Sequence, residues 1–163
     1  MKLNDTKAGR LDAMFEEYAG ELRAAGDEAA AVMLAYTHGL HRLWRPVLEM
    51  LPVRPGSSVL DVGSGLGILV FELAANVPVD VEGVDIERGF VEHSKILLGR
   101  LAGLGYFAEG KRIGFSVGDI SGLAFVDESF DFVFVREVFQ FVPDPGQAVA
   151  ELFRVLRPGG FLC

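Results

Sequence analysis

A glycine-rich stretch carries the residues of this sequence that are best suited to chemistry. It runs from Ser58 to Leu73 and reads SVLDVGSGLGILVFEL. A short apolar run, three alternate glycines and apolar residues at helical spacing predict a buried strand, a tight turn and the start of a helix. Glycines permit such a turn and let a ligand approach the backbone, while the first N–H groups of the helix point into the same space. The stretch therefore predicts a small-ligand site.

The spacing of the glycines and one carboxylate narrow the choice of ligand. A dinucleotide fingerprint requires G-x-G-x-x-G, but here the third glycine comes one residue early, at Gly67, and Ile68 follows it. Asp61 at the end of the strand would repel a pyrophosphate and attract a cation. A cationic ligand is therefore favoured, and an NAD-binding oxidoreductase is the less favoured alternative.

Composition excludes several classes of protein. The 163 residues suffice for one domain with a sizeable core, and half of them are hydrophobic. A net charge of -8 argues against nucleic acid as a partner. The single cysteine, Cys163, permits neither an internal disulfide nor a cysteine zinc site. No signal peptide and no apolar span long enough for a bilayer is evident, so we expect a cytoplasmic protein without a membrane partner.

Two helical patterns precede the glycine-rich stretch. The first runs from about Arg10 to Ala25, and the second follows a break at Gly26 and extends to about residue 51. Pro46 lies within the second pattern and predicts either a kink or a new helix starting near Arg45. We expect residues 1–52 to form a helical cap over the end of the glycine strand.

Residues 53–163 alternate between strand and helix patterns. Further strands are predicted at residues 79–86, 112–117 and 130–138 and from residue 161 onward. This alternation predicts an α/β fold with a parallel sheet and right-handed crossovers. The run 130–138, FDFVFVREV, is apolar enough for a central strand that is buried on both faces.

Several segments extend the pattern beyond one loop. VLDVGSGLG, GVDIE, GDISGLAF, ESFDFVFVREVFQFVPDP and ELFRVLRPGGFL occur in this order. Over about residues 53–163 the chain resembles the class I S-adenosylmethionine-dependent methyltransferases that act on small molecules (type 11/25-like). The resemblance implies a Rossmann-like, doubly wound parallel sheet and S-adenosylmethionine as cofactor. It also implies transfer of a methyl group to a small-molecule acceptor by in-line displacement.

The resemblance implies roles for the first two strand ends. The loop beside the methionine and ribose portions of the cofactor would consist of Gly63, Ser64, Gly65 and Gly67. Asp61 would lie near the cofactor's amino group. Asp85 would accept hydrogen bonds from both ribose hydroxyls, since a carboxylate offers two acceptor oxygens.

The remaining implied site residues follow the third and fourth strands. Asp119 would face the adenine amino group, with Ile86 and Ile120 against the ring faces. The methionine end near the acceptor would be lined by Arg136, Glu137 and Val138. Each carboxylate also has a structural interpretation, because acidic residues at strand ends favour turns. Convergence of three of them at the carboxyl ends of parallel strands favours a ligand site.

No catalytic base is assigned with the same strength. Relatives often carry histidine where this chain has Phe141, and the segment REVF lacks the Asn/Asp-Pro-Pro-aromatic signature of enzymes that methylate exocyclic amines. The weak candidates are His38, His41, Tyr18, Tyr36 and Glu137. Histidines three apart on an amphipathic helix are mostly surface or packing residues, so a structural role is favoured for them. No third ligand accompanies them, so no metal site is predicted.

The sequence ends three residues into its predicted fifth strand, whereas the family's fold continues through two more strands. We expect a fragment of a longer protein. The alternative is that another chain supplies the missing part, and the open sheet edge is then a place for association. A non-catalytic cofactor-binding or partner subunit with the same fold remains the alternative function, because binding and turnover use different residues.

Overall fold

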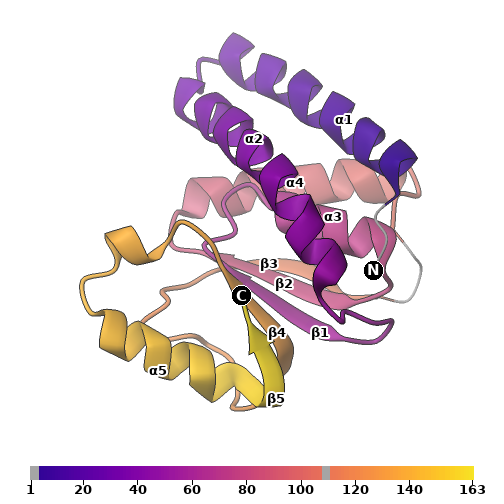
Figure 1. Ribbon diagram of the computed structural model, residues 1–163. Coiled ribbons are helices and arrows are strands. Elements are labelled where there is room, and N and C mark those ends of the chain that lie inside the picture. The colour runs from indigo at the N-terminus through magenta and orange to yellow at the C-terminus, as the bar shows by residue number, and fades with distance from the viewer. Residues whose placement is uncertain (1–3, 108–110) are drawn as a thin grey trace.

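The computed structural model describes residues 4–107 and 111–163, and only the backbone of residues 5, 6 and 40–43. Its strands form one parallel sheet in the order β3-β2-β1-β4-β5 (Figure 1). The strands are β1 (Ser58–Val62), β2 (Asp80–Asp85), β3 (Ile113–Val117), β4 (Phe130–Val135) and β5 (Leu156–Leu162). The helices are α1 (Asp5–Ala24), α2 (Glu28–Met50), α3 (Ile68–Asn76), α4 (Arg88–Gly103) and α5 (Pro145–Val155). The predicted Rossmann-like, doubly wound fold is confirmed.

The sheet is covered on both faces because its side chains alternate with a period of two. Val59, Phe132 and Phe134 pack in one core cluster with α3, α4 and the α1–α2 hairpin. Leu60 and Val133, which point the other way, pack in a second cluster under α5. Figure 1 shows α5 on the opposite side of the sheet from α3 and α4.

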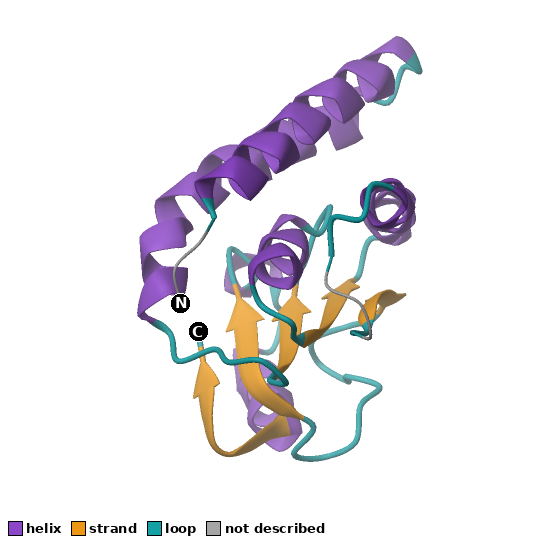
Figure 2. Ribbon diagram, turned by 90° about the vertical axis from the view of Figure 1, so that its right-hand side faces the viewer, coloured by secondary structure: helices purple, strands orange, loops and turns teal. Residues whose placement is uncertain are grey.

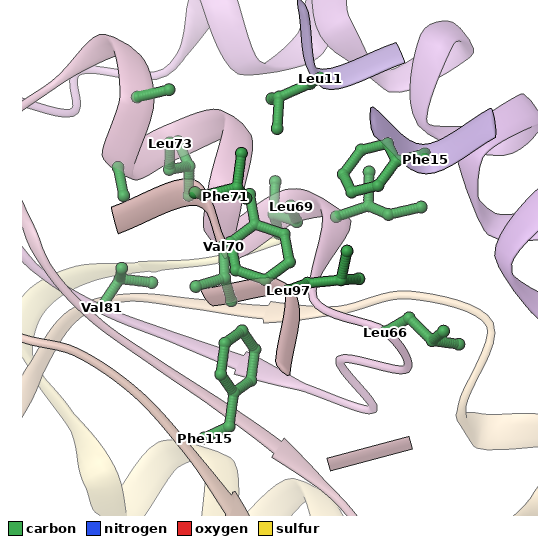
Figure 3. Packing of buried hydrophobic residues seen from close by; sticks show 14 of the residues in the cluster. Leu11, Phe15, Leu66, Leu69, Val70, Phe71, Leu73, Val81, Leu97 and Phe115 are labelled. Atoms are coloured by element: carbon green, nitrogen blue, oxygen red, sulfur yellow. The ribbon is translucent and has the colours of Figure 1, made fainter. Parts of the chain in front are cut away.

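The larger core joins the helical hairpin to the sheet through α3. The ring of Phe71 lies between Phe15 of α1 and Phe115 of β3, with centroid distances of 6.2 and 5.4 Å (Figure 3). Arg45 of α2 forms an ion pair with the buried Glu72 of α3 at 3.3 Å. The hairpin therefore shares its core with the sheet, and the boundary between residues 52 and 53 stays a prediction.

Helix α2 runs through Pro46 as one element to Met50. The alternative of a new helix near Arg45 is therefore wrong. A proline removes one helical hydrogen bond, and the helix continues past that gap for another turn. At the other end the side chain of Asp27 accepts the N–H of Ala30 at 3.1 Å, which caps α2 after the turn from α1. Figure 2 shows the resulting hairpin reaching beyond the sheet.

Two strand ends differ from the sequence prediction by more than one residue. β4 ends at Val135 rather than at residue 138, because Glu137 has a φ of 56° and cannot continue a strand. β5 begins at Leu156 rather than at Phe161. Leu156 pairs with Phe130, and the register then shifts before Phe161 pairs with Phe132.

β5 forms one edge of the sheet, beside the outer face of α5. Apolar side chains are exposed there, namely Val149, Phe153, Phe161 and Leu162. Association through this edge stays a prediction. Within the described ranges, no helix is long and apolar enough to cross a membrane.

Candidate functional site

The glycine loop between β1 and α3 has the tight geometry that its sequence predicts. Gly63 and Gly67 have φ values of 73° and 82°. A Cβ atom at Gly63 would lie 2.1 Å from Cγ2 of Val138, and one at Gly67 would lie 2.5 Å from Cζ of Phe115. The N–H groups of Gly63 and the following serine both donate to the carbonyl of Val84, at 2.8 and 3.0 Å. Only glycine fits these positions, and the loop is fixed to the end of β2.

A first cluster of polar groups lies where the glycine loop meets the end of β2 and helix α4. It consists of Gly65, Asp85, Glu87 and Ser94, and we call it the Gly65–Asp85 cluster. The N–H of Gly65 donates to Oδ2 of Asp85 at 2.7 Å, and the N–H of Glu87 donates to Oδ1 at 2.9 Å. The hydroxyl of the fully buried Ser94 donates to the carbonyl of Gly65 at 3.0 Å. Each oxygen of Asp85 retains acceptor capacity for a ligand.

A second cluster, the Asp61–Arg136 cluster, joins the ends of β1 and β4. Asp61 is 1% exposed, and its Oδ2 lies 3.8 Å from Nη2 of Arg136. Burial raises the pKa of Asp61 from its ordinary 3.8 to about 6; Arg136 opposes this rise, and the charge of Asp85 adds to it. The separation is too long for a direct hydrogen bond.

Three buried polar atoms at this edge of the sheet point to a ligand. Among the described side chains, Oδ2 of Asp61, Oγ of Ser64 and Nε of Arg136 are buried without a hydrogen-bond partner. Such atoms are rare in native proteins and each requires an explanation. A ligand that carries both a cationic and an anionic group fits them, because the cation would face Asp61 and the anion would face Arg136.

The residues implied for an adenine ring occupy the ends of β2 and β3. The N–H of Gly118 donates to the backbone carbonyl of Asp85 at 3.0 Å, which brings the two strand ends together. The exposed Asp119 accepts a hydrogen bond from the backbone N–H two residues later, at 2.8 Å. Ile86 is 64% exposed and offers an apolar face, whereas Ile120 is 7% exposed and packs in the core cluster under α5.

Two of the catalytic candidates have structural partners. Nε2 of His38 lies 2.5 Å from Oδ1 of Asp12, which links α2 to α1. The hydroxyl of Tyr18 lies 2.8 Å from Nδ1 of His93 in α4. Both geometries agree with the structural interpretation. The side chain of His41 lies outside the described residues.

Glu137 and Tyr36 both have exposed side chains. Glu137 adopts the left-handed φ of 56° immediately before Val138, whose methyl group occupies the space beside Gly63. Non-glycine residues in this conformation are strained and occur often at functional sites. The loop after β4 thus contacts the glycine loop directly.

Two polar residues of distant helices lie at the glycine loop, and sequence reasoning missed both. One is Ser94. The other is Thr37 of α2, whose Cγ2 would lie 3.8 Å from a Cβ atom on Gly65. Neither belongs to a local motif, and only the packing of α4 and α2 onto the sheet brings them to the loop.

Comparison with known proteins identifies the family. The model of a family described as "Methyltransferase domain" matches residues 60–163. Ubiquinone/menaquinone biosynthesis C-methyltransferase UbiE of Geotalea daltonii is 32% identical over 125 residues, which cover 75% of this chain and 51% of the relative. Demethylmenaquinone methyltransferase of Beutenbergia cavernae is 36% identical over 129 residues, which cover 76% and 47%. The structure of the YcgJ protein from Bacillus subtilis superposes with a TM-score of 0.63 at 28% identity, covering 75% of this chain and 49% of that chain.

The chain belongs to this methyltransferase family. Its fold is that of the class I enzymes, and S-adenosylmethionine is the cofactor that goes with family and fold. The resemblance to class I S-adenosylmethionine-dependent methyltransferases is confirmed, and the small-molecule acceptor stays a prediction. The chain spans about half the length of the two curated relatives.

Proposed function

We propose that this chain binds S-adenosylmethionine across the carboxyl ends of β2, β1 and β4 and transfers its methyl group to a small-molecule acceptor. The observation that carries the proposal is the set of buried polar atoms without partners on Asp61, Ser64 and Arg136 beside the glycine loop. The methionine portion of the cofactor has an amino group, which can pair with the carboxylate of Asp61, and a carboxylate, which can pair with the guanidinium of Arg136.

The Gly65–Asp85 cluster would hold the ribose. Hydrogen bonds from the N–H groups of Gly65 and Glu87 fix the carboxylate of Asp85, and its remaining lone pairs are available to two neighbouring hydroxyls. The exposed side chain of Ile86 would lie against the adenine ring. Asp119, at the end of β3, would accept a hydrogen bond from the adenine amino group.

The Asp61–Arg136 cluster would hold the charged end of the cofactor. Asp61 favours the cationic groups, and Arg136 carries the positive charge that a carboxylate requires. When bound, the cofactor supplies a methyl group that is already activated by a sulfonium. The chain's own residues therefore have to align the acceptor with that carbon and exclude water.

The loop after β4 supports an apolar acceptor. Phe139 and Phe141 follow Val138 in a 3-10 turn, and Phe141 is 77% exposed. The names of two relatives concern ubiquinone and menaquinone biosynthesis and demethylmenaquinone. We extend the proposal to an aromatic acceptor with an apolar body, which would pack against these two rings.

Binding and turnover are tested separately. Isothermal titration should show one S-adenosylmethionine per chain and no heat with NAD. Methyl-labelled S-adenosylmethionine is then incubated with a panel of reduced quinones and a matched panel of polar amines, and label is expected in the quinones. Binding of NAD alone would contradict the methyltransferase assignment. Cofactor binding without any label transfer would favour a non-catalytic subunit.

A further inference from the structure

Ser94 is a buried hydroxyl that no motif accounts for. It lies in α4 with no exposed surface, and its Oγ is 3.0 Å from the carbonyl of Gly65 and 2.9 Å from the carbonyl of Phe90. A serine hydroxyl has one proton to donate, so the two carbonyls compete for it. The position of that proton decides whether the hydroxyl of Ser94 donates to a carbonyl of its own helix or to the carbonyl in the glycine loop.

The two carbonyls differ in what else they bind. Phe90 lies four residues before Ser94, so its carbonyl accepts the backbone N–H of Ser94 in the α-helical pattern. Gly65 is buried in a loop, and within the described parts of the chain no other donor reaches its carbonyl. A buried carbonyl without a donor is costly. The hydroxyl proton therefore belongs to Gly65.

The residue Gly65 is consequently held on both sides. Its N–H donates to Asp85 at 2.7 Å, and its carbonyl accepts from Ser94. Its φ of 54° lies in the left-handed region. Because peptide groups are planar, these two bonds fix two successive peptide planes of the loop, one from the end of β2 and one from α4.

We propose that Ser94 is a positioning residue for cofactor binding, which holds the carbonyl of Gly65 so that the loop keeps the shape that receives S-adenosylmethionine. This inference rests on the proposed function. The hydroxyl need not contact the cofactor, because it acts through the orientation of the Gly65 peptide groups. Removing the hydroxyl, as in Ser94→Ala, leaves the loop carbonyl without a donor and lets the two peptide planes turn.

The test compares Ser94→Ala with a matched serine variant. Ser116 on β3 donates to Glu82 on β2 at 2.9 Å, so Ser116→Ala also deletes one side-chain hydrogen bond but leaves the loop intact. By isothermal titration with S-adenosylmethionine, Ser94→Ala should raise the Kd about tenfold, which corresponds to about 1.4 kcal/mol. Ser116→Ala should leave the Kd within about twofold, which is about 0.4 kcal/mol.

Two further readouts separate positioning from general stability. Exchange of the Gly65 amide proton, measured by NMR, should accelerate in Ser94→Ala and stay unchanged in Ser116→Ala. Ser94→Cys keeps a similar volume with a weaker donor, so its Kd should fall between those of wild type and Ser94→Ala. If Ser94→Ala does not fold, Ser94→Cys replaces it in the comparison with Ser116→Ala.

The outcomes are distinguishable. Absence of S-adenosylmethionine binding by the wild type would overturn the proposed function and this inference with it. Normal binding by the wild type with unchanged Kd in the Ser94 variants would overturn the inference alone. An equal loss of affinity in Ser116→Ala would do the same, because it would assign the effect to stability.

Discussion

The two polar clusters at the carboxyl edge of the sheet differ in how completely they are bonded. In the Gly65–Asp85 cluster, both carboxylate oxygens and both sides of Gly65 have hydrogen bonds. In the Asp61–Arg136 cluster, Oδ2 of Asp61 and Nε of Arg136 are buried without a hydrogen-bond partner. Folding alone supplies the partners of the first cluster, whereas we propose that a ligand supplies those of the second.

Because of this difference, substitutions in the two clusters should affect stability and cofactor affinity differently. Removing a residue of the Gly65–Asp85 cluster breaks bonds that the folded chain already makes, so stability and affinity should fall together. The ionised carboxylate of Asp61 is instead unfavourable in the free protein, because burial opposes its charge. Residues of the second cluster should therefore show a distinct dependence on pH.

The largest expected effect belongs to Asp85→Ala. The substitution removes the acceptor of two backbone N–H groups and the proposed partner of the ribose hydroxyls. Hydrogen bonds to a charged group contribute about 1.5–3 kcal/mol each, so the Kd for S-adenosylmethionine should rise at least about 100-fold and the free energy of unfolding should fall by about 3 kcal/mol. Calorimetric titration and urea unfolding measure the two. A stable variant with unchanged Kd would show that the first cluster does not hold the cofactor.

Asp61→Asn should change how stability depends on pH. The pKa of Asp61 is raised from 3.8 to about 6 in the folded state, so the folded protein holds this proton more tightly than the unfolded chain does. The resulting contribution to the free energy of unfolding is fully present below pH 3.8 and is lost as the pH rises through 6. The shift of about two units corresponds to a decrease of up to about 3 kcal/mol. Urea unfolding from pH 4 to pH 7 should show that the free energy of unfolding of the wild type decreases by this amount relative to that of Asp61→Asn, because the other carboxyl groups are common to both. Glu92→Gln, an exposed change on α4, is the control and should keep the wild-type slope.

The affinity for the cofactor should depend on pH in the opposite direction. Below a pKa of about 6, Asp61 is protonated and no longer attracts a cation. One unit below the pKa only about a tenth of the carboxyl groups are ionised, so the Kd for S-adenosylmethionine should rise about tenfold from pH 7 to pH 5. Asp61→Asn should bind weakly at both pH values. A wild-type Kd that does not change over this range would place the cation elsewhere.

The smallest effect is expected outside both clusters. Tyr18→Phe removes the hydrogen bond to His93 but keeps the aromatic ring beneath the guanidinium of Arg100, which lies 4.8 Å from its centroid. Stability should fall by about 1 kcal/mol, and the Kd for S-adenosylmethionine should stay within about twofold, about 0.4 kcal/mol. Thermal unfolding and titration provide both values. A large loss of methyl transfer with normal cofactor binding would return Tyr18 to the catalytic candidates.

The sequence predicted those parts of the site that depend on local spacing. The glycines of the loop follow a strand pattern directly, and Asp85 ends the next one, so their meeting follows from a parallel sheet whose carboxyl ends share one edge. The burial of Asp61 follows from its place within an apolar run. The alternation of strands and helices predicted a parallel sheet, and a parallel sheet places the glycine loop, Asp61 and Asp85 at one edge.

The contacts that the sequence did not predict join distant segments. Ser94 reaches Gly65 across 29 residues, and its contact depends on how α4 is rotated against the sheet. The left-handed conformation of Glu137 ends β4 inside an otherwise apolar run, and no local residue preference indicates it. The early start of β5 depends on a register shift against β4, which only the pairing itself determines.

The most direct test of the account is an NMR titration of the Asp61 carboxyl carbon with and without S-adenosylmethionine. The free protein should show a pKa of about 6. Saturating cofactor should lower this pKa, because a cation placed beside the buried carboxylate favours its charged form. A cofactor that binds and leaves the pKa of Asp61 unchanged would contradict the claim that the Asp61–Arg136 cluster is completed by this ligand.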